Sequence, residues 1–568
     1  MSTYRKMIVV WLAVALLISA CAPPAPAQSS VADTSPKAPS APKRIATAVM
    51  GVHTTLNSRT IGPGRPPGYD SLEALVSAGL GGPDGLGGWR GQLAEAMPTI
   101  ENGQWKLLPD GRMETAWTIR ANARWHDGQP VTTDDLLFTA RVIQDRDLPN
   151  FRDSAFNLVE EIVASDPRTL VVRWKQPFIE ADGLFTPPRN VPLPRHLLER
   201  SYAENKGSFL DLPYWNTEFV GAGAYRVREW TLGSRAVLDA DDGYVFGRPK
   251  IDVVEVRFIT DPSTLLANVL SGEVDVTMGR GLSLEQAADV RERWRAGKVD
   301  VAYESWVAIY PQMLNPNPAA ILDVEFRRAL LQLVDRAELV ESIQHGLVPV
   351  AHTILNPTEP EYREIAGSLV TYEFDPRRAT EGLERLGYNR SGDGGWRDSA
   401  GRSLAVEIRA TEGDVNEKSM FAVANYWQRA GLTVEPLVIP RARANDREWR
   451  NTRPAFELQR QPNALGDLDR YHSSQAALPE NNFTGSSKHR YMNPEFDALI
   501  DRYFATIPRP ERIEVVRQMV HHLSDRVIPL PLFYDANLVL VNDRVRNVGA
   551  RRGQDSTEAW NVETWDVT

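Results

Sequence analysis

Residues 118–135 read TIRANARWHDGQPVTTDD, and this stretch decides the fold more than any other. Asp127 and Gly128 form a turn signal, because glycine reaches the positive φ angles that tight turns need. Thr133 and the two aspartates after it are typical of a helix start, where side-chain oxygens and negative charge stabilise free backbone N–H groups. Apolar residues follow at helical spacing. The stretch therefore predicts a strand, a turn and an amphipathic helix.

Strand and helix signals continue to alternate downstream. Residues 253–260, VVEVRFIT, are β-branched and largely alternating, which predicts a strand. A helix is expected to start at Asp261 and to stop at Gly272, and residues 274–276 predict a further strand. Together these segments form a β-α-β unit.

Three more helices are expected in the second half of the chain. Their caps are Asp323, Asp335 and Asp375, each followed by apolar residues on one helical face. Strand signals at 404–408 and 432–439 lie between helices. The sequence therefore predicts an α/β fold.

The N-terminus has the pattern of an export signal. Arg5 and Lys6 precede an apolar run too short to span a bilayer comfortably, and small residues lead into Cys21, the only cysteine. The four residues before Cys21 resemble the lipobox of bacterial lipoproteins, whose cysteine carries the acyl chains. We therefore expect a signal peptide over 1–20 and lipidation at Cys21, with a plain signal peptide as the alternative. Residues 21–45, rich in Pro, Ala and Ser, predict a semi-rigid tether.

Size and charge limit the possible functions. The remaining residues exceed what one hydrophobic core needs, so two or more lobes are expected. The net charge of −10 becomes more negative when Arg5 and Lys6 leave with the signal, and no long basic run offsets it. An acidic surface repels nucleic acid, so no nucleic-acid partner is expected.

Six segments, taken in order, resemble one protein family. They are residues 118–135, 220–225 (VGAGAY), 272–275 (GEVD), 326–336 (FRRALLQLVDR), 491–497 (YMNPEFD) and 528–532 (IPLPL). The family is the extracytoplasmic solute-binding proteins of ABC importers, in the oligopeptide, dipeptide and nickel subgroup called family 5. Each segment also has a plain structural role, such as the tight turn expected at Gly221 and Gly223.

The resemblance implies a two-lobe periplasmic-binding-protein fold of type II, in the large variant with an extra subdomain. Lobe I is expected over 46–308 and again over 530–568, and lobe II over 309–529, with hinge strands between them. A ligand that contacts both lobes only when they close shifts the population toward the closed state, which a permease then reads.

The resemblance also points to ligand-binding residues. Peptide-binding relatives hold the substrate ammonium with an aspartate in a W-x-x-D-Y segment, and some place an arginine nearby. Here the corresponding candidates are Arg460, Asn463, Asp467, Asp469 and Tyr471. Asn463 stands where those relatives have the tryptophan, and Asp467 matches their aspartate only if the alignment shifts by one residue. Peptide specificity is therefore left open. The alternative for Asp467 and Asp469 is a solvated turn loop.

Asn57 and Tyr69 are further pocket candidates, because residues 54–57 resemble a loop that borders the family's cleft. No metal site is expected, since His521 and His522 are adjacent and cannot share one helical face. No motif of a nucleophile elbow, zinc protease, phosphate loop or redox pair occurs. We therefore predict no cofactor and no catalytic residue.

The sequence as a whole predicts a monomeric, lipid-anchored, extracytoplasmic receptor that delivers a peptide or related small polar solute to an ABC permease. Two alternatives stay open. One is an exported carbohydrate-active hydrolase, because two dispersed carboxylates would leave no spacing signal. The other is a ligand-sensing receptor that is not coupled to transport.

Overall fold

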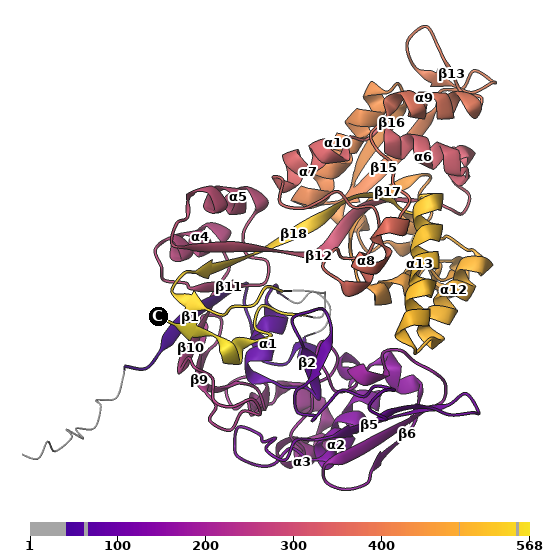
Figure 1. The fold of residues 1–568 in the computed structure, drawn as a ribbon. Coiled ribbons are helices and arrows are strands. Elements are labelled where there is room, and N and C mark those ends of the chain that lie inside the picture. Colours follow the sequence, from indigo (N-terminus) through magenta and orange to yellow (C-terminus); the bar gives the residue numbers. More distant parts are fainter. Residues whose placement is uncertain (1–40, 62–65, 488, 552–555) are drawn as a thin grey trace, which may run out of the picture. The chain divides into compact units, whose positions relative to one another are not determined.

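The computed structural model describes residues 41–61, 66–487, 489–551 and 556–568. Ten strands in this part of the chain form one mixed sheet (Figure 1). In spatial order they are β16 (Thr433–Ile439), β15 (Ala405–Thr411), β17 (Phe456–Pro462), β12 (Gly297–Pro311), β18 (Leu530–Asn542), β11 (Val276–Met278), β1 (Arg44–Met50), β10 (Val253–Ile259), β9 (Arg235–Ala240) and β8 (Tyr225–Thr231).

The two long strands β12 and β18 lie side by side in the middle of this sheet. They pair antiparallel from Gly297 opposite Asn542 to Ile309 opposite Leu530. On their outer edges β12 pairs with β17 and β18 pairs with β11. β18 is buried along nearly its whole length, which explains why apolar residues occupy both of its faces. The pair connects the strands from the first half of the sequence to the strands from the second half.

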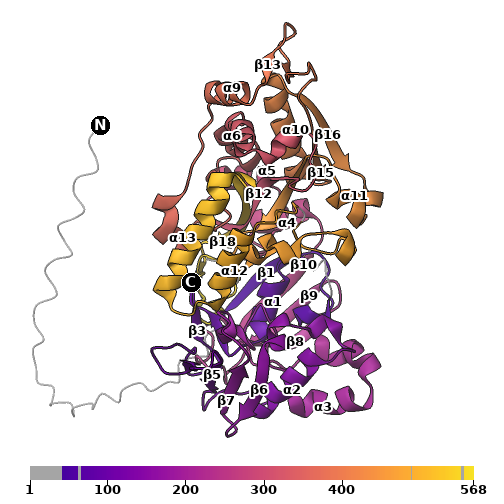
Figure 2. The same ribbon diagram turned by 90° about the vertical axis from the view of Figure 1, so that its right-hand side faces the viewer.

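A second, antiparallel sheet has four strands and lies near helices α2 and α3 (Figure 2). In spatial order its strands are β4 (Trp105–Leu107), β5 (Met113–Thr118), β7 (Thr169–Trp174) and β6 (Val159–Ala164). Buried and half-buried residues alternate strictly along β5, as expected for a strand with one face on a core.

The helices cover the sheets. Their bounds are α1 (Tyr69–Val76), α2 (Thr133–Gln144), α3 (Arg195–Glu204), α4 (Pro262–Leu270), α5 (Leu284–Arg293), α6 (Val324–Gln332), α7 (Arg336–Gln344), α8 (Pro360–Ile365), α9 (Pro376–Arg385), α10 (Asp414–Arg429), α11 (Arg447–Asn451), α12 (Pro494–Ala505) and α13 (Arg509–Arg526). The four predicted aspartate caps are confirmed, because the side chains of Asp261, Asp323, Asp335 and Asp375 each accept a backbone N–H of their helix.

Two sequence predictions need correction. The strand expected at 274–276 is β11, which starts at Val276, two residues later. Gly221 and Gly223 do not have the positive φ angles of a tight turn. They are instead where the chain passes closely over the end of α1, since a Cβ on Gly221 would lie 2.0 Å from the carbonyl oxygen of Val76. Steric closeness, not turn geometry, requires glycine there.

Two hydrophobic clusters fill the interior of the described chain. The first gathers apolar residues mainly from 306–540, together with those of α4 and α5. The second gathers residues mainly from 45–258 and from 539–565, including Trp565. The half-buried Ile179 packs against both. The fold is therefore mixed α/β, and β18 has buried residues in both clusters, whereas β12 has them in the first.

Candidate functional site

The loop after β17 contains most of the predicted site residues. It winds into a 3-10 helix, η10 (Leu465–Tyr471), and lies against a cavity of about 30 Å³. We call this cavity the polar pocket. Its lining residues are Tyr310, Ile354, Gln459, Gln461, Pro462, Asp467, Arg470, Tyr471, Ser486 and His489. Side chains from β12, β17, η10 and the segment before α12 thus converge on one place.

The polar pocket is lined by one ion pair. The carboxylate of Asp467 lies 2.7 Å from the guanidinium of Arg470, and its other oxygen accepts the backbone N–H of Ala464 at 3.1 Å. Burial raises the pKa of Asp467 above its ordinary value, against the opposing charge of Arg470. Both charges are therefore already partnered within the loop.

The other predicted residues of this loop have different surroundings. Tyr471 is 2% exposed and packs edge-on against the ring of His489, with centroids 4.6 Å apart. Asn463 is fully buried, and its amide donates to the carbonyl oxygen of Tyr303 at 3.3 Å. Asp469 is exposed. Of the candidates in this loop, Asp467 and Tyr471 line the polar pocket, and Asn463 and Asp469 do not.

The loop also meets a segment far away in the sequence. A Cβ on Gly466 would lie 3.0 Å from the carboxylate oxygen Oε1 of Glu180. Next to Glu180, Ile179 packs against both hydrophobic clusters. The polar pocket therefore lies close to the place where the two clusters meet.

Arg460 lies on the other face of β17. Gln459 and Gln461 point to the polar pocket, and side chains alternate along a strand, so Arg460 points away from it. Its guanidinium binds the carboxylate of Asp535 on β18, which also binds Arg280. The structure thus separates Arg460 from the other predicted residues.

The carboxylate of Asp535 is fully buried and is the centre of this charged cluster. Besides the two guanidiniums, it accepts the side-chain amide of Gln344 at 3.0 Å. Burial alone would raise the pKa of Asp535, but the charges of Arg280 and Arg460 and their hydrogen bonds outweigh it, so the pKa lies below the ordinary value. The carboxylate stays ionised and links three segments of the chain.

Asn57 and Tyr69 lie apart from the polar pocket. Asn57 is 2% exposed, and its side chain caps a short 3-10 helix by accepting the backbone N–H of Arg59 at 3.0 Å. The hydroxyl of Tyr69 donates to the carbonyl oxygen of Thr55, and its ring stacks on His53 with centroids 5.0 Å apart. Both side chains hold the loop before α1 in place.

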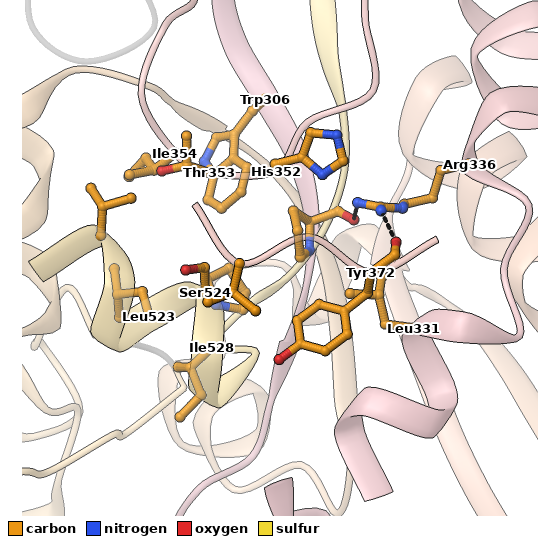
Figure 3. Close-up of a pocket in the computed structure, with 14 residues that line it drawn as sticks. Trp306, Leu331, Arg336, His352, Thr353, Ile354, Tyr372, Leu523, Ser524 and Ile528 are labelled. Carbon is orange, nitrogen blue, oxygen red and sulfur yellow. Dashed lines mark hydrogen bonds between the residues drawn. The ribbon is translucent and has the colours of Figure 1, made fainter. Parts of the chain in front are cut away.

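A second, smaller cavity of about 20 Å³ lies beside Trp306 (Figure 3). Arg336 reaches its edge, but the guanidinium donates to the backbone carbonyls of Ala351, at 2.8 Å, and of Tyr372. Burial lowers the pKa of His352 in the same wall. The guanidinium of Arg336 is therefore bound by backbone oxygens of the protein itself.

Metal ligands do not gather in the described part of the chain. No group of three or more His, Cys, Asp or Glu side chains has the geometry to hold an ion there. His521 is exposed on α13, whereas His522 stacks on Phe496 with centroids 4.7 Å apart and contacts the hydroxyl of Tyr491 at 2.8 Å. Cys21, the predicted lipidation site, lies outside the described residues.

Comparison with known proteins identifies the family. The model of bacterial extracellular solute-binding proteins, family 5 Middle, matches residues 97–478. The chain belongs to this family. Family 5 proteins to which it is similar include the oligopeptide-binding protein AppA of Bacillus subtilis, which is 20% identical over 479 residues, 80% of this chain and 81% of AppA. The periplasmic oligopeptide-binding protein OppA of Salmonella typhimurium is 22% identical over 77% of this chain and 79% of OppA.

Solved structures of family 5 proteins share the fold. AppA of Bacillus subtilis in complex with a nonapeptide aligns with a TM-score of 0.66 at 19% identity, covering 93% of this chain and 100% of AppA. NikA of Brucella suis in complex with Fe(III)-EDTA aligns with a TM-score of 0.73 at 18% identity, covering 92% of this chain and 100% of NikA. Members of this family are extracytoplasmic binding proteins. Within the described residues, no helix combines the length and the apolar character needed to span a bilayer.

Two buried residues of the polar pocket, Gln459 and His489, are not among the residues that the sequence predicted. A signal for the first was present, because β17, FELQRQP, carries several polar residues although it has a neighbouring strand on each side in the sheet. His489 follows no periodic pattern, so its burial could not be read from the sequence.

Proposed function

We propose that this chain is the extracytoplasmic receptor of an ABC importer, and that it captures a peptide or a related small polar solute for the permease. The observation that carries the proposal is the family 5 match over residues 97–478, together with a fold shared over nearly the whole length of AppA and NikA. Those two proteins bind a nonapeptide and a metal chelate in their solved structures. Solutes of such different chemistry imply that each chain's own pocket decides its ligand.

The proposed mechanism is closure of two lobes on the solute. Lobe I comprises residues 46–308 and 530–568, and lobe II comprises residues 309–529. Two long paired strands, of which β18 has buried residues in both hydrophobic clusters, support this division, because a paired connection permits bending while it limits other motions. A solute that contacts both lobes only in the closed state shifts the population toward that state.

The proposal includes an anchor and excludes turnover. Export by residues 1–20, lipidation of Cys21 and a tether over 21–45 would hold a monomeric receptor at the membrane beside its permease.

The polar pocket contains one carboxylate, Asp467, which is paired with Arg470. The acid and base pair of a glycoside hydrolase needs two carboxyl groups about 5–10 Å apart across the substrate, and the lining of this pocket has one.

Native mass spectrometry of freshly purified protein tests this function. The expected result is a noncovalent adduct in the mass range of a small solute, which is released chemically unchanged and rebinds with a saturable change in tryptophan fluorescence. Conversion of the released solute into product at catalytic rates would instead favour an exported hydrolase.

A further inference from the structure

A chain of hydrogen bonds along the polar pocket has a fixed direction. The guanidinium of Arg470 can only donate, so its 2.7 Å contact with Gln461 identifies the amide oxygen of that side chain. Gln461 must then present its nitrogen to Gln459, whose amide oxygen accepts it at 2.6 Å. The nitrogen of Gln459 is left at the end of the chain. It is buried and has no hydrogen-bond partner among the described residues.

His489 is the second buried group of this kind. It is 2% exposed, and its Nδ1 lies 2.9 Å from the hydroxyl of Ser487. Its Nε2 is buried and finds no partner in the part of the chain that the structure describes. Burial, and then the charge of Arg453, lower the pKa of His489 to about 3. The ring is therefore neutral at physiological pH and offers a hydrogen bond without charge.

Two side chains that line one cavity each carry an unpartnered polar atom, and this coincidence points to a ligand group. A buried donor or acceptor left without a partner costs about 1–3 kcal/mol, which a bound group would recover. The cavity of about 30 Å³ has room for a hydroxyl or a carbonyl. Gln459 presents a donor, so the group that it receives must carry an acceptor.

The charges of the pocket exclude an ionic group. An ammonium would meet the N–H donor of Gln459, and Asp467 is already bound to Arg470 and to a backbone N–H. A carboxylate would need a cation, and Arg470 is held by Asp467 and Gln461. Burying a charge without a partner is far more costly than burying a hydrogen-bonded neutral group.

We infer that the polar pocket binds an uncharged oxygen group of the solute, a hydroxyl or a carbonyl, through Gln459 and His489. The solute is therefore neutral at the end that it places in this pocket. The inference rests on the proposed function and names the class of its substrate. A sugar hydroxyl and the carbonyl of an N-acylated peptide share this chemistry, and the experiment separates them.

A competition experiment tests the inference on the intact receptor. The probes are a tripeptide mixture with free N-termini, the same mixture after N-acetylation, and a mixture of neutral di- to tetrasaccharides, with retention read by native mass spectrometry at pH 7. We expect at least tenfold preference for one of the two neutral mixtures, and the one retained identifies the source of the oxygen. Preference for free N-termini, or equal retention of free and acetylated peptides without a preference for the saccharides, would overturn the inference and leave the receptor function standing. Retention of no mixture would overturn both.

Substitutions in the pocket give a second readout. Gln459→Leu and His489→Phe should each weaken the retained neutral probe at least tenfold. Each also removes one side-chain hydrogen bond, to Gln461 or to Ser487, so the unfolding midpoint is measured beside the affinity. Gln518→Leu, an exposed position on α13, is the matched control and should leave affinity unchanged. Unchanged affinity in both pocket variants would mean that the cavity holds only water, and would refute the inference. The competition experiment decides the question even if a variant fails to fold.

Discussion

Replacing Asp535 by asparagine should destabilise the folded chain strongly. The carboxylate is fully buried and holds the guanidiniums of Arg280 and Arg460, which are 30% and 37% exposed. Removing one partner of a buried ion pair costs about 3–5 kcal/mol, because the remaining charges lose their counter-charge. Here the two guanidiniums reach solvent in part, so we expect the lower end, about 3 kcal/mol.

Urea unfolding at pH 7, followed by circular dichroism, measures this loss for Asp535→Asn. The matched control is Asp289→Asn, whose exposed pair with Arg293 on α5 should contribute about 0.5 kcal/mol or less. Because its folded pKa is lowered, Asp535 contributes stability above the ordinary aspartate pKa and loses it as the pH falls through the folded value. The difference between the parent protein and the variant should therefore shrink in acid. A variant as stable at pH 7 as the control would refute this account of the cluster.

Three further predictions concern stability. Burial lowers the pKa of His53 to about 4, so its contribution is present above about pH 6.5 and is lost as the pH falls. Between pH 7 and pH 5, the free energy of unfolding of His53→Phe should therefore fall by about 2 kcal/mol less than that of the parent protein. An identical pH dependence of the two proteins in urea titrations would contradict this. Gly221→Ala should lower the free energy of unfolding by about 3 kcal/mol, because its Cβ would clash with the carbonyl of Val76. Gly392→Ala, where no atom lies within 4 Å of the added Cβ, should be nearly neutral. Equal melting temperatures of the two variants would show that the close approach at Gly221 is wrong. Asp375→Ala should cost about 1 kcal/mol through loss of the cap on α9, and thermal unfolding that is unchanged would argue against the cap.

The helix starts could be predicted because their causes are local. Asp261, Asp323 and Asp375 each bond to a backbone N–H two or three residues later, so the whole interaction lies within a short window of sequence. The strand β10 was likewise predicted within one residue from alternation alone. Patterns of this kind depend on no distant partner.

The site could be predicted only in part, because its partners are distant in sequence. Arg460 fits a family position, but its bond to Asp535 depends on a strand 75 residues later. The steric need at Gly221 comes from α1, far earlier in the chain. The pocket roles of Gln459 and His489 depend on which face of β17 is covered and by what. Composition and spacing contain none of this information.

The most direct test of the central claim is a distance measurement across the proposed lobes. Cys21 is the only cysteine, so a protein that starts after it carries spin labels only at introduced sites such as Lys106→Cys and Arg377→Cys, both exposed. The protein is stripped of its solute by unfolding and refolding, and is then reloaded with the solute identified by native mass spectrometry. The account predicts that the distance between the labels shortens as binding saturates and that the solute is recovered intact. A distance that stays the same at saturation would contradict it.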